Sequence, residues 1–240
     1  MTHNNAAAAL GPRPWPDGET VVVDAILFDL DGTLIDSTEA TEKCWREWAR
    51  RLELGEYGEH PHGVPARDVV AQHVEPARRE EALRLIVELE VAETDGIHIK
   101  DGVRELLDGL PAERWAIVTS CTAALAATRM HAVGIVPPTV MVTADDVEDG
   151  KPDPEGYVAA ARRLGVEPSR CLVVEDAPAG VTAGNASGAW SLAVEGTYPR
   201  GDLAAGAVVG SLGTVAVEQR PDGTLSVRSR SEPAAGESGA

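Results

Sequence analysis

Five short runs of apolar and β-branched residues recur along the chain, separated by longer and more polar stretches. Each run is too short for a helix and ends at glycine, proline or polar residues, which is typical of strands buried on both faces of a sheet. The runs cover residues 21–30, 115–119, 139–143, 171–175 and 190–194. We therefore predict five buried strands.

Helical patterns lie between these runs. The stretches "DGVRELLDGL", "TAALAATRMHAVG" and "PDPEGYVAAARRLG" predict helices, and the last two end on Gly134 and Gly165, which are suited to C-caps. Strands alternating with helices indicate an α/β fold, a Rossmann-like parallel sheet with helices on both faces. Near the end, a Pro-Asp-Gly turn in "GTVAVEQRPDGTLSVRS" predicts a hairpin.

The interval after the first strand is too long for a single crossover. Residues 37–100 contain several helical stretches and predict a small α-helical domain inserted into the core. The core would then consist of residues 21–36 and 101–228. Residues 1–20 and 229–240 are rich in small and polar residues, so we expect a disordered leader and a disordered tail.

The amino-acid composition limits which partners and which cellular environment are compatible with the chain. The formal charge of −18 argues against nucleic acid and anionic membranes as partners, while 43% apolar residues support a substantial core. No run of about 18 apolar residues is present, so no membrane span is expected. Cys44, Cys121 and Cys171 are widely spaced and favour reduced thiols in a cytoplasmic protein.

Chemically useful side chains follow four of the predicted strands. In an open parallel sheet, ligands bind at the carboxyl ends of the strands, so these side chains are expected to converge. They are Asp29, Asp31, Thr119, Ser120, Lys151, Glu175 and Asp176. Each alone is more often a cap, a turn former or a solvated charge. Together they indicate a site where carboxylates are crowded around a hard cation such as Mg²⁺, which prefers oxygen ligands and phosphate.

The stretches "FDLDGTL", "IVTSC", "GKPDPEGY" and "VVEDAPAGVTAG" resemble, in order, the four motifs of the haloacid dehalogenase-like hydrolase superfamily. The resemblance covers roughly residues 25–194. The helical insertion is similar to the superfamily's α-helical cap, and the motifs are most similar to those of its small sugar-phosphate and polyol-phosphate phosphatases. The implied partner is a small phosphorylated metabolite.

The resemblance implies a role for each motif residue. Asp29 would be the nucleophile that forms an aspartyl-phosphate, and Asp31 would be the general acid and base. Thr119 and the Ser120 backbone would hold phosphoryl oxygens, and Lys151 would neutralise charge.

The same resemblance implies a Mg²⁺ site. Its ligands would be Asp29, the Asp31 carbonyl and Asp176, with Glu175 assisting. Phosphoryl transfer needs mainly positioning and charge neutralisation, and this set of groups provides both.

Four alternatives differ from this hypothesis. Dehalogenases and phosphonate-cleaving relatives lack an acid/base Asp two residues after the nucleophile, so Asp31 argues against both. Phosphomutases of the β-phosphoglucomutase type keep both Asp residues but carry a cap-hinge His, where this chain has Thr41. A non-catalytic binding protein on the same fold would typically have lost a motif residue, and none is missing.

Substrate choice is expected to lie in the insertion. The stretch "HPHGVPARDVV" resembles the substrate-specificity loop of capped relatives, which makes His62 and Arg67 candidate substrate-binding residues. The identity of the sugar or polyol stays open. One cap over one site suggests that a monomer, or a weak dimer, is sufficient.

Overall fold

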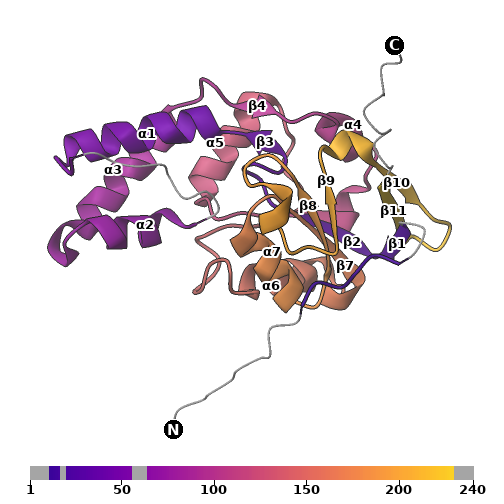
Figure 1. Ribbon diagram of the computed structural model, residues 1–240. Helices are drawn as coiled ribbons and strands as arrows, with labels where there is room; N and C mark the ends of the chain where they lie inside the picture. Colours follow the sequence, from indigo (N-terminus) through magenta and orange to yellow (C-terminus); the bar gives the residue numbers. More distant parts are fainter. Residues whose placement is uncertain (1–10, 17–19, 56–63, 230–240) are drawn as a thin grey trace, which may run out of the picture.

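A six-stranded parallel sheet lies at the centre of the computed structural model, which describes residues 11–16, 20–55 and 64–229. The strand order is β6-β5-β2-β7-β8-β9 (Figure 1). The strands are β2 (Ala25–Phe28), β5 (Trp115–Val118), β6 (Val140–Val142), β7 (Cys171–Glu175), β8 (Trp190–Val194) and β9 (Ala207–Val209). The predicted α/β fold with a Rossmann-like parallel sheet is confirmed.

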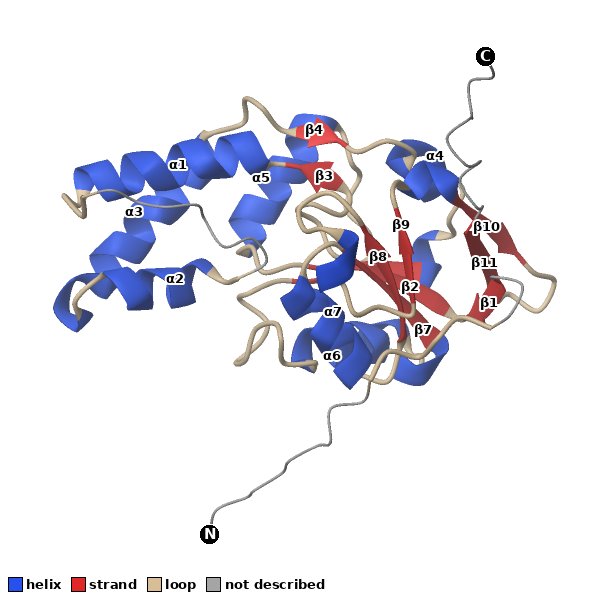
Figure 2. Cartoon of the chain, in the orientation of Figure 1, coloured by secondary structure: helices blue, strands red, loops and turns tan. Residues whose placement is uncertain are grey.

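Helices cover both faces of this sheet (Figure 2). Ile26 and Phe28 point to one face and pack in the same cluster as residues of α4 and α5, whereas Ala25 and Leu27 point to the other and pack with α6 and α7. The alternation follows from the two-residue period of a strand. The helices are α4 (Val103–Asp108), α5 (Ala123–Val133), α6 (Glu155–Leu164) and α7 (Pro178–Ala186).

The prediction that residues 21–30 form one strand is wrong. Residues 21–30 divide at Asp24 into β2 and β1 (Thr20–Val23), and β1 belongs to a second, antiparallel sheet. At the bend, the backbone N–H of Asp24 donates to the carbonyl of Arg170 at 2.7 Å, and the two side chains form an ion pair. The predicted hairpin is present as β10 (Val215–Gln219) and β11 (Leu225–Ser229), and β1 pairs with β11.

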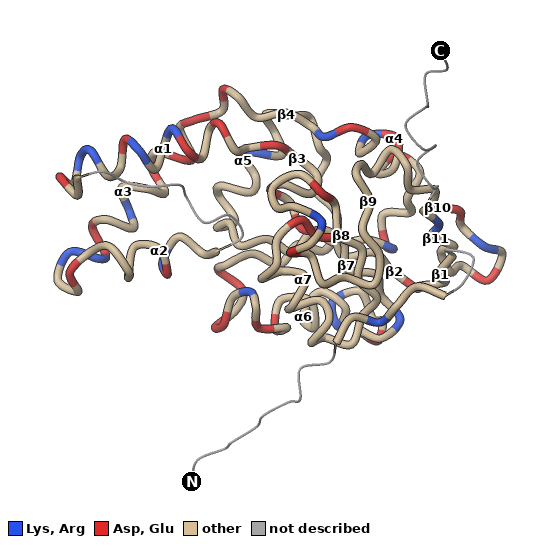
Figure 3. The backbone as a smooth tube through the Cα atoms, in the orientation of Figure 1, with Lys and Arg blue, Asp and Glu red and all other residues tan. Residues whose placement is uncertain are grey.

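Three helices inserted after the first core strand form a hydrophobic cluster of their own. They are α1 (Thr38–Arg51), α2 (Ala66–His73) and α3 (Arg79–Ala92), called here the helical unit. Trp45 and Trp48 pack edge to face inside it, and the indole of Trp48 donates to the Ala82 carbonyl at 2.7 Å. Acidic and basic positions both occur along α1 and α3 (Figure 3), and on α1 they form ion pairs between Glu42 and Arg46 and between Glu47 and Arg51.

Two short antiparallel strands connect the helical unit to the core. They are β3 (Ile35–Asp36) and β4 (His98–Ile99). Beside them, the ammonium of Lys100 donates to the Gly32 carbonyl at 2.5 Å. The two connections therefore leave the core directly next to the loop that follows β2.

The structure differs from the expected disordered leader over residues 11–16. The indole of Trp15 donates to the Ser191 carbonyl at 3.3 Å, and the guanidinium of Arg13 lies 3.6 Å from the centre of the Trp190 ring. The rest of the predicted leader up to residue 19 lies outside the described residues, as does the predicted tail beyond Ser229. None of the described helices is long and apolar enough to cross a membrane.

Candidate active site

The carboxyl ends of β2, β5 and β7 bring three buried side chains to one edge of the sheet. Asp29 follows β2, and its N–H donates to the Val174 carbonyl at 3.0 Å. Thr119 follows β5, and its N–H donates to the Val142 carbonyl at 2.9 Å. Asp176 follows β7, and all three side chains are buried. These hydrogen bonds continue the pairing of the sheet, so rigid backbone holds the site.

Lys151 reaches this edge from the loop before α6. Its ammonium lies 2.5 Å from Asp29 Oδ1 and 2.7 Å from Glu175 Oε1, and it donates to the Val118 carbonyl at 3.0 Å. The three N–H groups of the ammonium thus each have an acceptor. Burial would lower the pKa of Lys151, but Asp29 and Glu175 raise it well above its ordinary value. Lys151 therefore stays protonated.

Both oxygens of Glu175 are engaged by the protein. Besides the ammonium of Lys151, Oε1 accepts from the Tyr157 hydroxyl at 3.0 Å. Oε2 accepts from the backbone N–H groups of Asp176 and Ala177 at 2.9 and 3.0 Å. Glu175 therefore orients Lys151 and the loop that carries Asp176, and both of its carboxylate oxygens have hydrogen-bond partners within the protein.

Asp176 differs in having a buried oxygen without a partner. Its Oδ1 accepts from the Thr33 hydroxyl at 3.3 Å, whereas Oδ2 makes no hydrogen bond within the described residues. Gly32 (φ 86°) lies so close that an added Cβ would stand 1.9 Å from Oδ2. Burial, then repulsion from Glu175, raises the pKa of Asp176 to about 7, and the neighbouring Thr197 hydroxyl offsets only part of this.

These acidic groups fit a divalent cation. Carboxylate oxygens of Asp29, Glu175 and Asp176 lie within 4.8 Å of one another, with Lys151 as their close cationic partner. Burial raises the pKa of Asp29 well above its ordinary value, Lys151 opposes this, and Glu175 and Asp176 add to it. A bound cation would relieve that repulsion and supply the missing partner of Asp176 Oδ2. The oxygen-only donor set suits hard ions.

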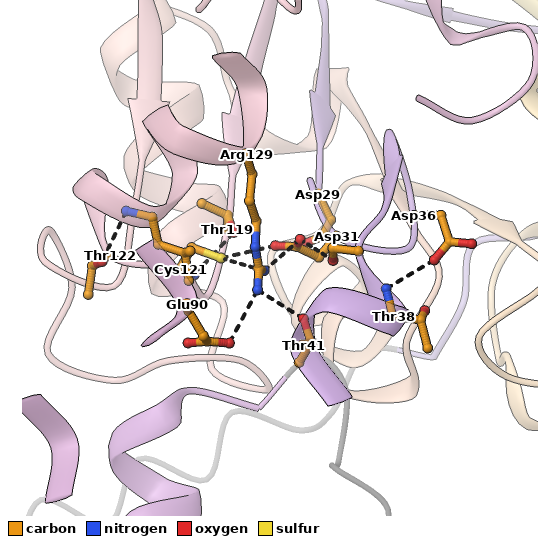
Figure 4. Close-up of polar contacts among 12 residues, drawn as sticks. Asp29, Asp31, Asp36, Thr38, Thr41, Glu90, Thr119, Cys121, Thr122 and Arg129 are labelled. Atoms are coloured by element: carbon orange, nitrogen blue, oxygen red, sulfur yellow. Dashed lines mark hydrogen bonds and ion pairs between the residues drawn. The ribbon is translucent and has the colours of Figure 1, made fainter. Parts of the chain in front are cut away.

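Asp31 has a separate set of partners (Figure 4). Its carboxylate accepts from the Ser37 hydroxyl at 2.6 Å and the Cys121 thiol at 2.9 Å, and Arg129 Nη1 lies 2.6 Å from Oδ1. Burial would raise the pKa of Asp31, but Arg129, Cys121 and Ser37 together hold it below its ordinary value. Asp31 is therefore ionised in this arrangement.

Sequence analysis did not identify Arg129 and Glu90, which form a buried ion pair. Nη2 of Arg129, on α5, lies 3.2 Å from Glu90 Oε1, on α3, and 2.9 Å from the hydroxyl of Thr41, on α1. A signal was available, because Arg129 and Glu90 each lie four residues after a buried apolar residue, Leu125 and Ile86. A charge on the apolar face of a helix requires a buried partner.

A cavity of about 280 Å³ lies between the core and the helical unit. Its volume is close to the lower end of the range for small-molecule sites. Residues from both parts of the chain line it, including Asp29, Asp31, Ser120, Trp45, Arg67 and Glu90. The two aspartates predicted to be catalytic therefore face one cavity.

The two residues expected to bind substrate from the insertion have different outcomes. His62 lies outside the described residues. Arg67 lines the cavity from the first turn of α2, and its guanidinium donates to the Glu148 carbonyl of the core at 2.8 Å. Arg67 thus joins the helical unit to the core beside the site.

Comparison with known proteins agrees with the predicted motifs. The family model of haloacid dehalogenase-like hydrolases matches residues 23–188. Hexitol phosphatase A of Escherichia coli is 39% identical over 84% of this chain and 97% of its own length. A 2-deoxyglucose-6-phosphate phosphatase of Saccharomyces cerevisiae is 31% identical over 75% of this chain and 83% of its own. The crystal structure of a Pseudomonas syringae hydrolase superposes with a TM-score of 0.70 at 27% identity, covering 78% and 93% of the two chains.

The matched segment contains every core motif residue discussed above, from Asp29 to Asp176, and the two relatives align with 84% and 75% of the chain. This agreement confirms the predicted family and the predicted enzyme class. The chain belongs to the haloacid dehalogenase-like hydrolase family, and it is a phosphoric monoester hydrolase.

Proposed function

We propose that this hydrolase is a Mg²⁺-dependent phosphatase that removes phosphate from a small sugar or polyol through an aspartyl-phosphate on Asp29. The observation that carries the proposal is the position of Asp29 on the cavity wall, 2.5 Å from the Lys151 ammonium and beside the acidic cluster. The substrates named in its relatives, a hexitol phosphate and 2-deoxyglucose-6-phosphate, support the substrate class.

In the first step, a carboxylate oxygen of Asp29 attacks phosphorus and the ester bond to the leaving oxygen breaks. For this step Asp31 must carry a proton, which it takes from water in the second step of the preceding turnover; it passes this proton to the leaving oxygen, so the product leaves as an alcohol. Lys151 and the Thr119 hydroxyl stabilise the charge on the transferring phosphoryl group. The Thr119 Oγ1 accepts from the Cys121 N–H at 3.1 Å, which leaves its proton available for the phosphate.

In the second step, water attacks the phosphorus of the aspartyl-phosphate. Asp31 accepts the proton of this water, which is possible because the first step has left it ionised. The bond between phosphorus and Asp29 breaks, inorganic phosphate is released and the Asp29 carboxylate is restored. The ionised Asp31 held by Ser37, Cys121 and Arg129 corresponds to the protonation state that this step requires.

Asp29 and Asp176 would hold Mg²⁺, together with the Asp31 carbonyl, and Glu175 would support them through Lys151 and the backbone. The bound ion would neutralise phosphoryl oxygens and orient the ester for in-line attack.

The helical unit is proposed to act as a cap. It closes the cavity over Asp29 and would exclude bulk water while the phosphoryl group is transferred. Ser120 would bind a phosphoryl oxygen through its backbone. Arg67 and His62 would contact the sugar or polyol.

One chain supplies all the proposed groups, so a monomer is sufficient for activity. Cys44, Cys121 and Cys171 are free and buried, which fits the proposed cytoplasmic location. The position expected to carry His in a phosphomutase holds Thr41, whose hydroxyl accepts from Arg129 at 2.9 Å. This arrangement favours hydrolysis over mutase activity.

A panel of phosphorylated sugars and polyols, assayed with purified protein and Mg²⁺, tests the proposal. We expect release of inorganic phosphate from at least one hexitol or hexose phosphate, and loss of that activity in Asp29→Asn. Turnover that persists in Asp29→Asn would refute the assignment of the nucleophile.

A further inference from the structure

The guanidinium of Arg129 connects the acid/base aspartate to the helical unit through two different nitrogens. Nη1 faces the core, where it lies 2.6 Å from Asp31 Oδ1 and donates to Cys121 Sγ at 3.3 Å. Nη2 faces the helical unit, where it donates to Thr41 Oγ1 at 2.9 Å and Glu90 Oε1 at 3.2 Å. Figure 4 shows Arg129 between Asp31 on one side and Glu90 and Thr41 on the other.

Most of this arrangement is buried. The side chains of Arg129 and Glu90 are each 6% exposed, and the side chain of Asp31 is 22% exposed toward the cavity. A buried cation must have partners, and removing one of them leaves an uncompensated charge. Arg129 therefore depends on groups from both parts of the chain.

Because the guanidinium is planar, contacts on one side of it fix the orientation of its other side. Its nitrogens are fixed relative to one another, so groups that hold Nη2 also determine where Nη1 points. Thr41 belongs to α1 and Glu90 to α3, whereas Arg129 belongs to α5 of the core. Withdrawal of the helical unit would release Nη2, and Nη1 would no longer be held at its observed position against Asp31.

We propose that Arg129 is a positioning residue through which Glu90 and Thr41 of the helical unit set the orientation of Asp31. The inference rests on the proposed function, because it assigns the consequence to the acid/base step. Closure of the helical unit would thus place the leaving-group alcohol in the site and, at the same time, orient Asp31 as its proton donor. Asp29 and Lys151 pair with each other and with Glu175 rather than with Arg129, so their geometry does not depend on it.

The test compares two esters that differ in their need for a proton. The leaving group of 2-deoxyglucose-6-phosphate requires protonation, whereas p-nitrophenolate requires little. In Glu90→Gln we expect kcat for the sugar phosphate to fall at least about tenfold, within the range known for general acids. The first-step rate with p-nitrophenyl phosphate, measured as the burst of p-nitrophenol, should stay within about twofold. Thr41→Val keeps the charges and should shift the two esters in the same unequal way.

Glu93→Gln is the matched control. Glu93 directly follows α3 and pairs with Lys43 of α1, so it connects the same two helices at a position away from Asp31. We expect it to change neither ester by more than about twofold. Equal losses with both esters in Glu90→Gln, or a change confined to KM, would overturn the proposal and assign Glu90 to stability or to substrate binding.

A double variant separates this inference from the proposed function. In an Asp31→Asn background, Glu90→Gln should cause no further loss with the sugar phosphate, because its effect passes through Asp31. A further loss of tenfold in that background would contradict the proposal. Wild-type turnover and its absence in Asp29→Asn, measured first, report on the phosphatase assignment independently.

Discussion

Replacing Gly32 by alanine tests the role of Asp176. Gly32 has a φ of 86°, and an alanine Cβ at this position would lie 1.9 Å from Asp176 Oδ2 and 2.5 Å from its Cγ. Carbon and oxygen atoms do not approach this closely, so the carboxylate would have to move by on the order of 1 Å. A displacement of that size in a catalytic constellation costs about 100-fold in rate.

The substitution also strains the backbone, and a second glycine measures that cost. Gly165 has a φ of 72° at the end of α6, with nothing within 4 Å of an added Cβ. In both variants, left-handed alanine should cost about 1–2 kcal/mol of stability. Each kcal/mol corresponds to a decrease in Tm of about 2–4 °C for a chain of this size. Gly165→Ala should therefore lose stability but keep its activity.

The assay is kcat as a function of Mg²⁺ concentration, with Tm measured in parallel. We expect Gly32→Ala to lose about 100-fold in kcat and to need at least about tenfold more Mg²⁺ for half-maximal activity. Gly165→Ala should match the wild type in both quantities. If Gly32→Ala matched Gly165→Ala in activity and Mg²⁺ dependence, Asp176 would not be a metal ligand.

Three further results are expected. EDTA should abolish turnover and Mg²⁺ should restore it, whereas Ca²⁺ should restore it poorly because its looser coordination misplaces the nucleophile; full activity in EDTA would refute the metal site. Arg67→Ala removes a side chain that lines the cavity and its hydrogen bond to the Glu148 carbonyl, so the relative kcat/KM values among phosphate esters should change. If the ranking of substrates stayed the same, Arg67 would not determine substrate specificity. Asp24→Asn should lower the free energy of unfolding by up to about 1 kcal/mol at pH 7. The hydrogen bond from Arg170 lowers the pKa of Asp24. This stabilisation is therefore present above the ordinary pKa of aspartate and disappears as pH falls through the lowered value. A difference in unfolding free energy between wild type and variant that persists in acid would contradict this.

The convergence of the motif residues at one edge of the sheet could be predicted from the sequence, because it follows from local patterns. Each motif residue lies at the end of a strand or in the loop that follows it, and a parallel sheet brings such loops together at one edge. Lys151 lies 122 positions from Asp29 in the chain and still contacts it at 2.5 Å.

Features that depend on long-range packing were missed. The split at Asp24 arises because β1 pairs with β11, with Val21 opposite Val227, and no local signal separates β1 from β2. Strand β9 has three residues and is only partly buried, so its pattern is weak. The contact between Arg129 and Glu90 requires knowing how the helical unit docks on the core, which periodicity within one helix does not contain.

The central claim is that Asp29 carries the phosphoryl group. Asp31→Asn keeps this nucleophile but removes the base that activates water, so the phosphoenzyme should accumulate with p-nitrophenyl phosphate. Rapid-quench mixing followed by mass analysis of the protein tests this directly. The account predicts a burst of p-nitrophenol close to one per enzyme, with one phosphoryl group on the peptide that contains Asp29. It also predicts no label when Asp29 is replaced by Asn. Turnover without a burst and without phosphorylated protein, or a label on another residue, would contradict it.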